Sequence, residues 1–347
     1  MVHVVLLLAC AVVIYLACEW FINAVEWLGA HLRVGAVAVG TILAAVGTAL
    51  PESIVTLVAV TFGSHRQGAD IGVGAAMGGP LVVGTIAYGI TGATLLLRNR
   101  HRARATVAAG ARVSSDRAPE PAVLPSGETA RLAKDQTWFL IIFAVKVAVG
   151  LVAFAIKPWL GLLFFATYGV YFWREMHAEG DAASSADLEP LKLQPQRATP
   201  ARWAVIAQTL VTLAIIFGAS QLFVRQLEWA GPALGLPAAV VALLLSPIAT
   251  ELPEVLNAII WVRQGKTHLA LANLSGAMMI QATVPSGIGI LFTPWKFGAA
   301  LILAGIATAA AIGYLLRLLR TGRFTAARLT AAAGFYAAFA IALVFAV

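Results

Sequence analysis

A five-residue pattern that ends in a glutamate occurs twice in the sequence. Thr-x-Leu-Pro-Glu spans residues 48–52 and again residues 250–254. Each copy lies well inside an apolar stretch, where placing a carboxylate in a membrane costs at least about 2.5 kcal/mol. An acidic residue in such a place marks a functional site by default. Glu52 and Glu254 are therefore candidate ligands for a cation.

The proline before each glutamate strengthens this interpretation. Proline has no N–H and clashes with the carbonyl four residues earlier, so the helix kinks and the carbonyls of Gly47 and Ala249 lose their helical partners. Free carbonyl and carboxylate oxygens are hard ligands that suit Ca²⁺ or Na⁺. Thr48 and Thr250 lie four residues before each glutamate and share its face. One kinked span with one glutamate fits a structural role equally well, but two matching copies favour a shared cation site.

The composition identifies the class of protein that carries these motifs. Of the 347 residues, 60% are apolar and only 12% are charged, whereas soluble domains carry about 25% charged residues. The mean hydropathy is +0.87. These values exclude soluble globular, disordered and disulfide-stapled proteins and predict an all-α polytopic membrane protein. A membrane-spanning helix needs about 20 mainly apolar residues. Ten stretches qualify: 2–28, 36–62, 69–97, 137–156, 158–175, 203–229, 236–262, 268–292, 296–318 and 325–347.

Two polar stretches divide these spans. Residues 99–135 and 176–201 are expected to be flexible cytoplasmic linkers, rich in Ala, Ser, Pro and charged residues. The first repeat then comprises residues 1–98 with spans 1–3 and residues 136–175 with spans 4–5, and the second repeat comprises residues 202–347 with spans 6–10. Each half holds one Leu-Pro-Glu motif on its second span. Each half has five spans, and an odd number places the two halves in opposite orientations in the membrane. We therefore expect ten transmembrane helices in two inverted five-helix repeats, an arrangement common in secondary transporters.

The distribution of Lys and Arg predicts the orientation in the membrane. With both termini outside, the inside loops hold 19 of the 24 basic residues and the outside loops hold 4, as the positive-inside rule requires. We therefore expect a multi-pass plasma-membrane protein with the lipid bilayer as its environment and no nucleic-acid partner. The sequence contains neither a Walker A motif nor His-Glu-x-x-His, which argues against an ATP-driven pump and a zinc protease. No enzyme is predicted, and no pattern indicates an oligomeric state.

The paired motifs resemble the two alpha-repeats of the calcium/cation antiporter superfamily, which includes the sodium/calcium exchangers. In that family each repeat carries Gly-Thr-Ser-Leu-Pro-Glu, and the next span carries a Gly-Asn-x-x-Gly-Ser-Asn-type element. The resemblance implies secondary antiport of Ca²⁺ or another divalent cation against Na⁺ or H⁺ by alternating access, without a cofactor. It also implies that the first and sixth spans slide against the rest to switch access. Matched residue by residue, it implies metal ligands at Thr48, Glu52, Thr250, Glu254 and Gln281, and carbonyl ligands at Ala45 and Pro247.

The sequence also departs from the family pattern. Ala49 stands at the first serine of the motif, Gly79 removes a hydroxyl and Val83 removes a side-chain amide on the third span. Ala277 replaces the corresponding serine in the second half. These changes support an alternative, in which the chain is a transport-impaired or regulatory membrane protein that keeps the exchanger fold.

Glu251 is a further departure, because it replaces the serine of the second motif. It lies three residues before Glu254, so both side chains can face one cavity, and Glu251 is therefore a further candidate residue of the metal site. Three carboxylates in a poorly solvated site favour protonation of at least one of them. Our hypothesis is that Glu251 shifts the coupling ion toward H⁺. Alternatively, Glu251 faces a neighbouring helix or a polar vestibule.

Lys146 and Glu19 are further charged residues that lie deep within predicted spans. Lys146 falls in the middle of the fourth span and therefore needs a partner or a cavity. Glu19, on the first span, is one candidate partner and a candidate to line an ion path.

Overall fold

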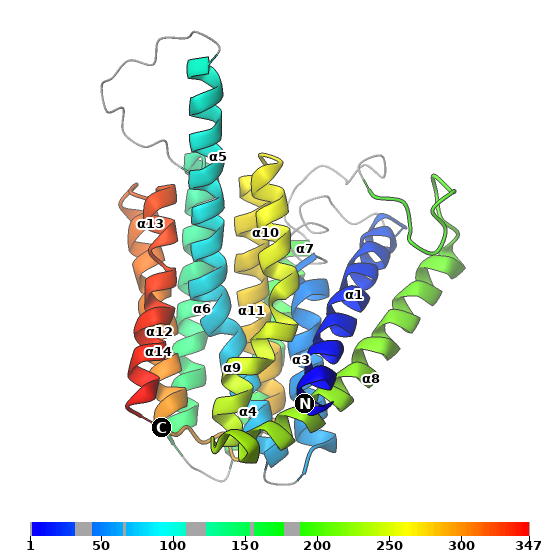
Figure 1. The fold of residues 1–347 in the computed structure, drawn as a ribbon, viewed down its shortest axis with the longest axis vertical. Coiled ribbons are helices and arrows are strands. Elements are labelled where there is room, and N and C mark those ends of the chain that lie inside the picture. Colours follow the sequence, from blue (N-terminus) through cyan, green and yellow to red (C-terminus); the bar gives the residue numbers. More distant parts are fainter. Residues whose placement is uncertain are drawn as a thin grey trace.

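The computed structural model describes residues 2–31, 44–64, 67–108, 123–152, 156–176 and 188–346, of which residues 44–48, 102–108, 175–176 and 248 are described by their backbone only. The described residues form helices joined by loops, without strands, and most of the long helices lie roughly along one common axis, with α1 and α8 inclined to it (Figure 1). The helices are α1 (Val2–His31), α3 (Ala44–Phe62), α4 (Gln67–Val82), α5 (Tyr88–Ala108), α6 (Ser126–Leu151), α7 (Leu160–Met176), α8 (Arg202–Leu234), α9 (Ala238–Thr250), α10 (Leu252–Arg263), α11 (Thr267–Phe292), α12 (Ala299–Arg320), α13 (Ala326–Thr330) and α14 (Ala333–Val344). A π-helical turn, η2 (Val83–Ala87), joins α4 to α5, and a 3₁₀ turn, η3 (Lys157–Trp159), precedes α7.

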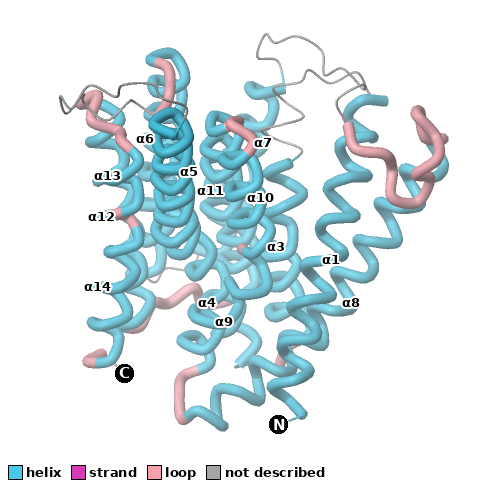
Figure 2. The backbone as a smooth tube through the Cα atoms, turned by 45° about the horizontal axis from the view of Figure 1, so that its top comes forward, coloured by secondary structure: helices cyan, strands magenta, loops and turns pink. Residues whose placement is uncertain are grey.

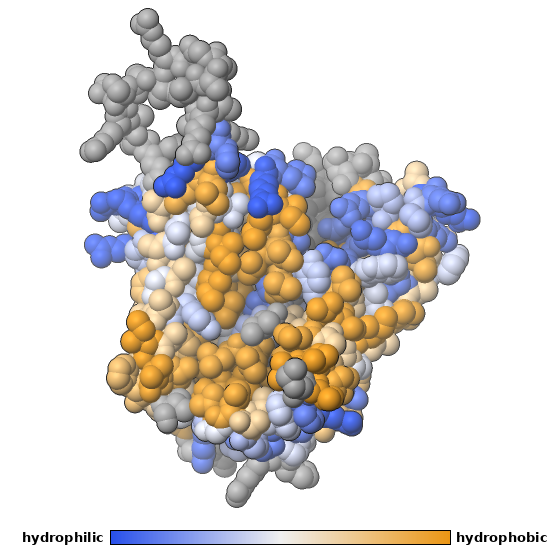
Figure 3. All heavy atoms as spheres, in the orientation of Figure 1, coloured by the Kyte–Doolittle hydropathy of each residue, from blue (hydrophilic) through white to orange (hydrophobic). Residues whose placement is uncertain are grey.

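Seven helical stretches in the described part of the chain are long and apolar enough to cross a membrane. Each coincides with a predicted span, and α3 contributes a shorter apolar helix at Ala49–Phe62. Apolar residues cover much of the face in Figure 3, whereas polar residues gather at its upper end and in a smaller group at its lower end. The seven stretches are Val2–His31, Gln67–His101, Arg202–Leu234, Ala238–Arg263, Thr267–Phe292, Ala299–Arg320 and Ala326–Val344.

The third-span helices and the motif helices that pack against them form the centre of the bundle. In α11, 89% of the most apolar stretch is buried, against 39% in α1 and 33% in α8. Helix α3 packs against α11, and α9 packs against α4, while α1 and α8 pair with each other. Each motif helix of one half therefore lies against the third-span helix of the other half. The outer helices present apolar side chains such as Leu8 and Trp203 outward, where lipid replaces water as the solvent.

Glycines allow α4 to approach α9 closely. A Cβ on Gly74 would overlap the carbonyl of Ala239, and a Cβ on Gly78 would lie 2.6 Å from the Leu243 oxygen and 2.8 Å from the Pro247 Cγ. Small residues at such crossings bring helix backbones together in membranes. This contact fixes the position of the first half of the chain relative to the second half, next to the motif residues.

The second motif interrupts its helix, whereas the first does not. Helix α9 ends at Thr250 and α10 begins at Leu252, with Glu251 between them. In the first half, α3 continues through Pro51. Proline fits the first turn of a helix, where its missing N–H has no helical partner to lose, so Pro253 starts α10 without cost. Broken helices within a membrane protein commonly build ion sites.

The structure corrects the extent of the first linker. Helix α5 continues to Ala108 and α6 begins at Ser126, so both ends of the expected linker 99–135 are helical. Alanine and arginine are strong helix formers, and they extend a helix beyond the apolar stretch that predicts a span. Residues 109–122 of this linker lie outside the described residues.

The second linker is also different from the expectation, because residues 188–201 are docked instead of flexible. Leu191 is fully buried in a cluster with Trp27 of α1 and Val205 of α8. Asn23 accepts a hydrogen bond from the Lys192 N–H at 3.0 Å, and the Trp27 indole donates to the Glu189 carbonyl at 2.9 Å. Composition did not reveal this docking because the partners lie far away in sequence. Figure 2 shows the segment as a loop beside the ends of α1 and α8.

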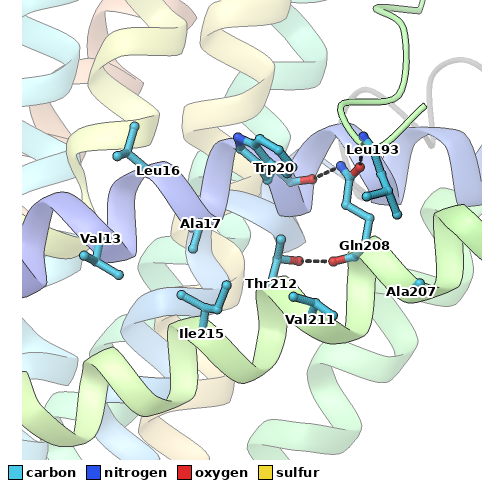
Figure 4. Close-up of a pocket in the computed structure, with 10 residues that line it drawn as sticks. All are labelled: Val13, Leu16, Ala17, Trp20, Leu193, Ala207, Gln208, Val211, Thr212 and Ile215. Atoms are coloured by element: carbon cyan, nitrogen blue, oxygen red, sulfur yellow. Dashed lines mark hydrogen bonds between the residues drawn. The ribbon is translucent and has the colours of Figure 1, made fainter. Parts of the chain in front are cut away.

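Gln208 connects the docked segment to both helices. Its amide donates to the Trp20 carbonyl at 2.8 Å, and its side-chain oxygen accepts the Leu193 N–H at 2.8 Å (Figure 4). These bonds lie at one end of an apolar cavity of about 370 Å³ between α1 and α8, lined by residues that include Val13, Ala17 and Ile215. The cavity therefore follows the α1–α8 pair and is separate from the motif residues.

Candidate functional site

Glu52 is fully buried where α3 meets α4. Its carboxylate lies against Gly79, since a Cβ built there would come within 2.6 Å of both the Glu52 Cδ and Oε1. Neither carboxylate oxygen of Glu52 accepts a hydrogen bond from the described residues. A buried carboxylate without donors is costly unless a cation or a proton compensates it. This makes Glu52 a strong candidate ligand for a mobile cation.

Glu251 faces helix α11. Its Oε2 accepts a hydrogen bond from the Gln281 side-chain amide at 2.6 Å, and its Oε1 accepts one from the Thr250 hydroxyl at 2.8 Å. All three side chains are buried. Three of the predicted ligands thus form one hydrogen-bonded group, built across the break between α9 and α10.

The second motif glutamate lies in the first turn of α10. Glu254 is fully buried, and it interacts electrostatically with Cys18 of α1 and with Glu52. Glu52 also interacts electrostatically with Glu251. The three acidic side chains, one from the first half and two from the second, therefore share one electrostatic environment inside the bundle.

A buried lysine belongs to the same environment. Lys146 of α6 is fully buried, and its ammonium donates to the Ala76 carbonyl at 2.7 Å and to the Gln281 carbonyl at 3.4 Å. It interacts electrostatically with Glu52. Glu19, the partner considered from the sequence, is exposed and accepts a hydrogen bond from the Tyr15 hydroxyl instead.

The structure describes the remaining predicted site residues to different extents. The side chains of Thr48 and Ala45 lie outside the described residues, although their backbone belongs to α3. The Pro247 carbonyl accepts the Glu251 N–H at 2.9 Å, which leaves one lone pair for a ligand. Ala277 packs with Ala49 in a small apolar cluster.

Further buried polar groups on α3 and α11 were not assigned from the sequence. Asn273 of α11 is fully buried, and neither its amide nitrogen nor its amide oxygen has a hydrogen-bond partner among the described residues. The hydroxyl of Thr56, one turn after Glu52 on α3, is also buried without a hydrogen-bond partner among the described residues. A polar residue inside an apolar span is the signal that could have identified both. In the described part of the chain, no three His, Cys, Asp or Glu side chains come close enough together to hold a metal ion.

The family follows from a comparison with known proteins. The sequence model described as "Sodium/calcium exchanger protein" matches residues 2–175 and 204–347. The chain belongs to this family. It is therefore a multi-pass membrane protein of the exchanger type, within the calcium/cation antiporter superfamily, and its family is one of transporters acting on inorganic cations. The resemblance inferred from the two Leu-Pro-Glu motifs is confirmed.

Individual relatives agree with this assignment. CaxA of Alkalimonas amylolytica, a proposed antiporter, is 27% identical over 170 residues, which cover 47% of this chain. The match spans about half the length of that relative. The crystal structure of an H⁺/Ca²⁺ exchanger, CAX, superimposes with a TM-score of 0.72 at 16% identity, over 99% of this chain and 82% of that one. The sodium-calcium exchanger NCX_Mj superimposes with a TM-score of 0.60 at 16% identity, over 98% of both chains. At these identities the two structures establish a shared fold.

Proposed function

We propose that this protein is a secondary active antiporter that exchanges Ca²⁺, or another divalent cation, against Na⁺ or H⁺ by alternating access. The observation that carries the proposal is a pair of fully buried glutamates, Glu52 and Glu254, which come from different halves of the chain and interact inside the bundle. A cation can compensate both carboxylates, which otherwise stay buried at a high cost in free energy.

The proposed architecture is ten transmembrane helices in two inverted five-helix repeats. The reciprocal packing of α3 with α11 and of α4 with α9 supports it, since a two-fold relation between the halves produces such paired contacts. In this arrangement substrate sites lie at the interface between the repeats. The motif glutamates fall at that interface.

We propose the plasma membrane as the location, with both termini outside. The start of α1 and the end of α14 lie toward the same end of the molecule, opposite the projecting end of α5 (Figure 1). The projecting end carries arginines that include Arg98 and Arg100. The positive-inside rule assigns that end to the cytoplasm.

The proposed metal site consists of Glu52 and Glu254, with Thr48, Thr250, Gln281 and the carbonyls of Ala45 and Pro247 as supporting ligands. Glu251 shares hydrogen bonds with Thr250 and Gln281, so it adjoins this set. Its carboxylate is the group that we propose for the exchangeable proton. Loading of the cation and release of the proton would then occur next to each other.

Flux measurements test the proposal. Purified protein in proteoliposomes is expected to take up ⁴⁵Ca²⁺ when an outward Na⁺ or H⁺ gradient is imposed. Glu52→Gln and Glu254→Gln should each abolish gradient-driven uptake, because each removes a charged ligand. Glu189→Gln is the matched control, since Glu189 is an exposed acid that lies outside the site. Equal flux in all four proteins would refute the site assignment.

The alternative is a transport-impaired or regulatory protein with the exchanger fold. Gly79, Val83 and Ala277, which lack the polar groups of the family pattern, favour it. It predicts no uptake by the wild-type protein under either gradient, although Ca²⁺ still changes the thermal stability through Glu52 and Glu254. Gradient-driven uptake by the wild type would exclude it.

A further inference from the structure

The ammonium of Lys146 is held by two backbone carbonyls at the centre of the bundle. These belong to Ala76 on α4 and Gln281 on α11, one helix from each half of the chain. The side chain has no exposed surface. No carboxylate oxygen of the described residues lies within 4.0 Å of the ammonium, so its immediate ligands are neutral oxygens.

Both carbonyls lack their usual helical donors for the same reason. Pro80 lies four residues after Ala76 within α4, and Pro285 lies four residues after Gln281 within α11. In each case the residue that would donate to the carbonyl has no N–H. The two prolines therefore leave two oxygens in the core without a backbone donor, and Lys146 donates to both. The Gln281 carbonyl also accepts a hydrogen bond from the Ser286 hydroxyl at 3.3 Å, so the Ala76 carbonyl is the closer partner of the ammonium.

Free backbone carbonyls at the centre of a transporter are ligands for monovalent cations such as Na⁺. An ammonium is a compact positive charge with hydrogen-bond donors only, so it satisfies the same oxygens as a metal ion does. The neighbouring charge agrees with this role, because Lys146 interacts electrostatically with Glu52. The position thus combines free oxygens, a nearby acid and a cation.

We propose that Lys146 is a tethered cation that occupies a monovalent-cation site between the carbonyls of Ala76 and Gln281. The chain supplies its own positive charge at a point where a free ion would otherwise bind. This site is separate from the proposed metal ligands, although it adjoins them through the backbone of Gln281. The wild-type protein would consequently need no Na⁺ at this position.

The inference makes a direct binding prediction that does not depend on transport. Lys146→Ala removes the ammonium and opens space beside the two carbonyls. The variant should unfold at a lower temperature in choline chloride, and NaCl at the same ionic strength should raise its Tm saturably, by roughly 2–4 °C well above the Kd. The wild-type protein should lack this additional rise, so the quantity compared is the difference between the Na⁺-dependent Tm shifts of Lys146→Ala and the wild type, both measured without Ca²⁺.

Two control variants separate a cation site from a general loss of packing. Lys146→Met removes the charge but fills the space, so its Tm should fall without a Na⁺ response beyond that of the wild type. Lys157→Ala removes another buried lysine, which donates to the Val152 and Trp295 carbonyls at 2.7 and 2.9 Å beyond the core helices. It should also be destabilised without gaining a response to Na⁺. Equal responses to Na⁺ in Lys146→Ala and Lys157→Ala would overturn the proposal.

A second variant covers the case in which Lys146→Ala does not fold in choline medium. Lys146→Ser introduces a side chain almost as small as alanine and adds one oxygen ligand. It should therefore show the same dependence on Na⁺ as Lys146→Ala. The recovered yield of folded Lys146→Ala should likewise increase when extraction and purification are carried out in NaCl. If Na⁺ improves neither the yield nor the Tm of either variant, Lys146 does not occupy a cation site.

The consequence for transport rests on the proposed function. In proteoliposomes, ⁴⁵Ca²⁺ uptake by Lys146→Ala should become dependent on Na⁺ on the loading side, whereas wild-type uptake should not require it there. The two ideas fail separately. A wild type without any Ca²⁺ flux would refute the proposed function, while the Na⁺-dependent Tm of Lys146→Ala would still support the tethered cation.

Discussion

The carboxylate of Glu52 occupies the space that a side chain at position 79 would need. An ideal Cβ on Gly79 would lie 2.6 Å from the Glu52 Cδ, closer than real Cβ atoms approach other heavy atoms. Gly79 stands where the resembled family pattern has serine. The glycine therefore does more than remove a hydroxyl, because it lets the first motif glutamate sit against α4.

This relationship predicts the effect of restoring a side chain. Gly79→Ser should force the Glu52 carboxylate away from α4 and reduce ⁴⁵Ca²⁺ uptake at least tenfold. Overpacking of a buried site should also lower the free energy of unfolding, by about 1–3 kcal/mol. Uptake and thermal unfolding should be measured on the same preparation. Unchanged uptake in Gly79→Ser would show that the position of Glu52 against Gly79 is not needed for transport.

Replacing Glu251 tests the coupling ion. Glu251→Gln keeps the size of the side chain but cannot release a proton, so uptake of ⁴⁵Ca²⁺ driven by a pH gradient should be lost. The measurement compares uptake under H⁺ and Na⁺ gradients in the same vesicles. If the pH-driven uptake of Glu251→Gln equals that of the wild type, Glu251 does not carry the proton.

The hydrogen bond between Gln281 and Glu251 should appear as an energetic coupling. Gln281→Leu removes the donor 2.6 Å from the Glu251 Oε2, and hydrogen bonds to charged groups contribute about 1.5–3 kcal/mol. In a Glu251→Leu background the same change should cost less, because no carboxylate is left without a donor. Chemical denaturation of the four proteins completes a double-mutant cycle. Additive losses would argue against the interaction.

The tight crossing of α4 and α9 gives a prediction about stability. Gly78→Ala places a methyl group 2.6 Å from the Leu243 oxygen and should lower the free energy of unfolding by about 1–3 kcal/mol. Gly218→Ala is the matched control, because a Cβ there meets no atom within 4 Å. That control should be neutral or slightly stabilising, as expected for alanine in a helix. Similar losses in both variants would contradict the close packing.

Docking of residues 188–201 predicts a change in protease sensitivity. Asn23→Ala removes the side chain that accepts the Lys192 N–H and donates to the Pro190 carbonyl at 3.2 Å. Limited proteolysis should then cleave this segment several-fold faster than in the wild type. Tyr15→Phe, on the same helix and away from the segment, should leave the cleavage rate unchanged.

The sequence predicted those features that depend on local patterns. Stretches of about 20 apolar residues set the positions of the spans, and the repeated Leu-Pro-Glu pattern identified Glu52 and Glu254 as buried acids. The ends of α5 and α6 could not be derived from hydropathy, because helix-forming residues continue both helices into polar sequence. Hydropathy sets how long a segment stays in lipid, and it carries no information on where a helix stops.

The partners of the buried polar groups required the tertiary structure. Lys146 is bonded to carbonyls of Ala76 and Gln281, which are 70 and 135 residues away in the chain. Carbonyl oxygens are present at every residue, so no side-chain pattern distinguishes these two. Proline spacing was the available signal, since Pro80 and Pro285 each lie four residues after an acceptor. The bond between Gln281 and Glu251 likewise depends on how α11 crosses the break after Thr250.

The segment 188–201 bridges Asn23 on α1 and Gln208 on α8 and fixes the distance between two helix ends. Because this segment binds both helices, α1 and α8 should move together as one rigid body. The family resemblance implies that the first and sixth spans, α1 and α8, slide during exchange. With this connection, neither helix can slide without the other. A fluorophore attached through Glu189→Cys, at an exposed side chain of this segment, would then follow the movement of both helices.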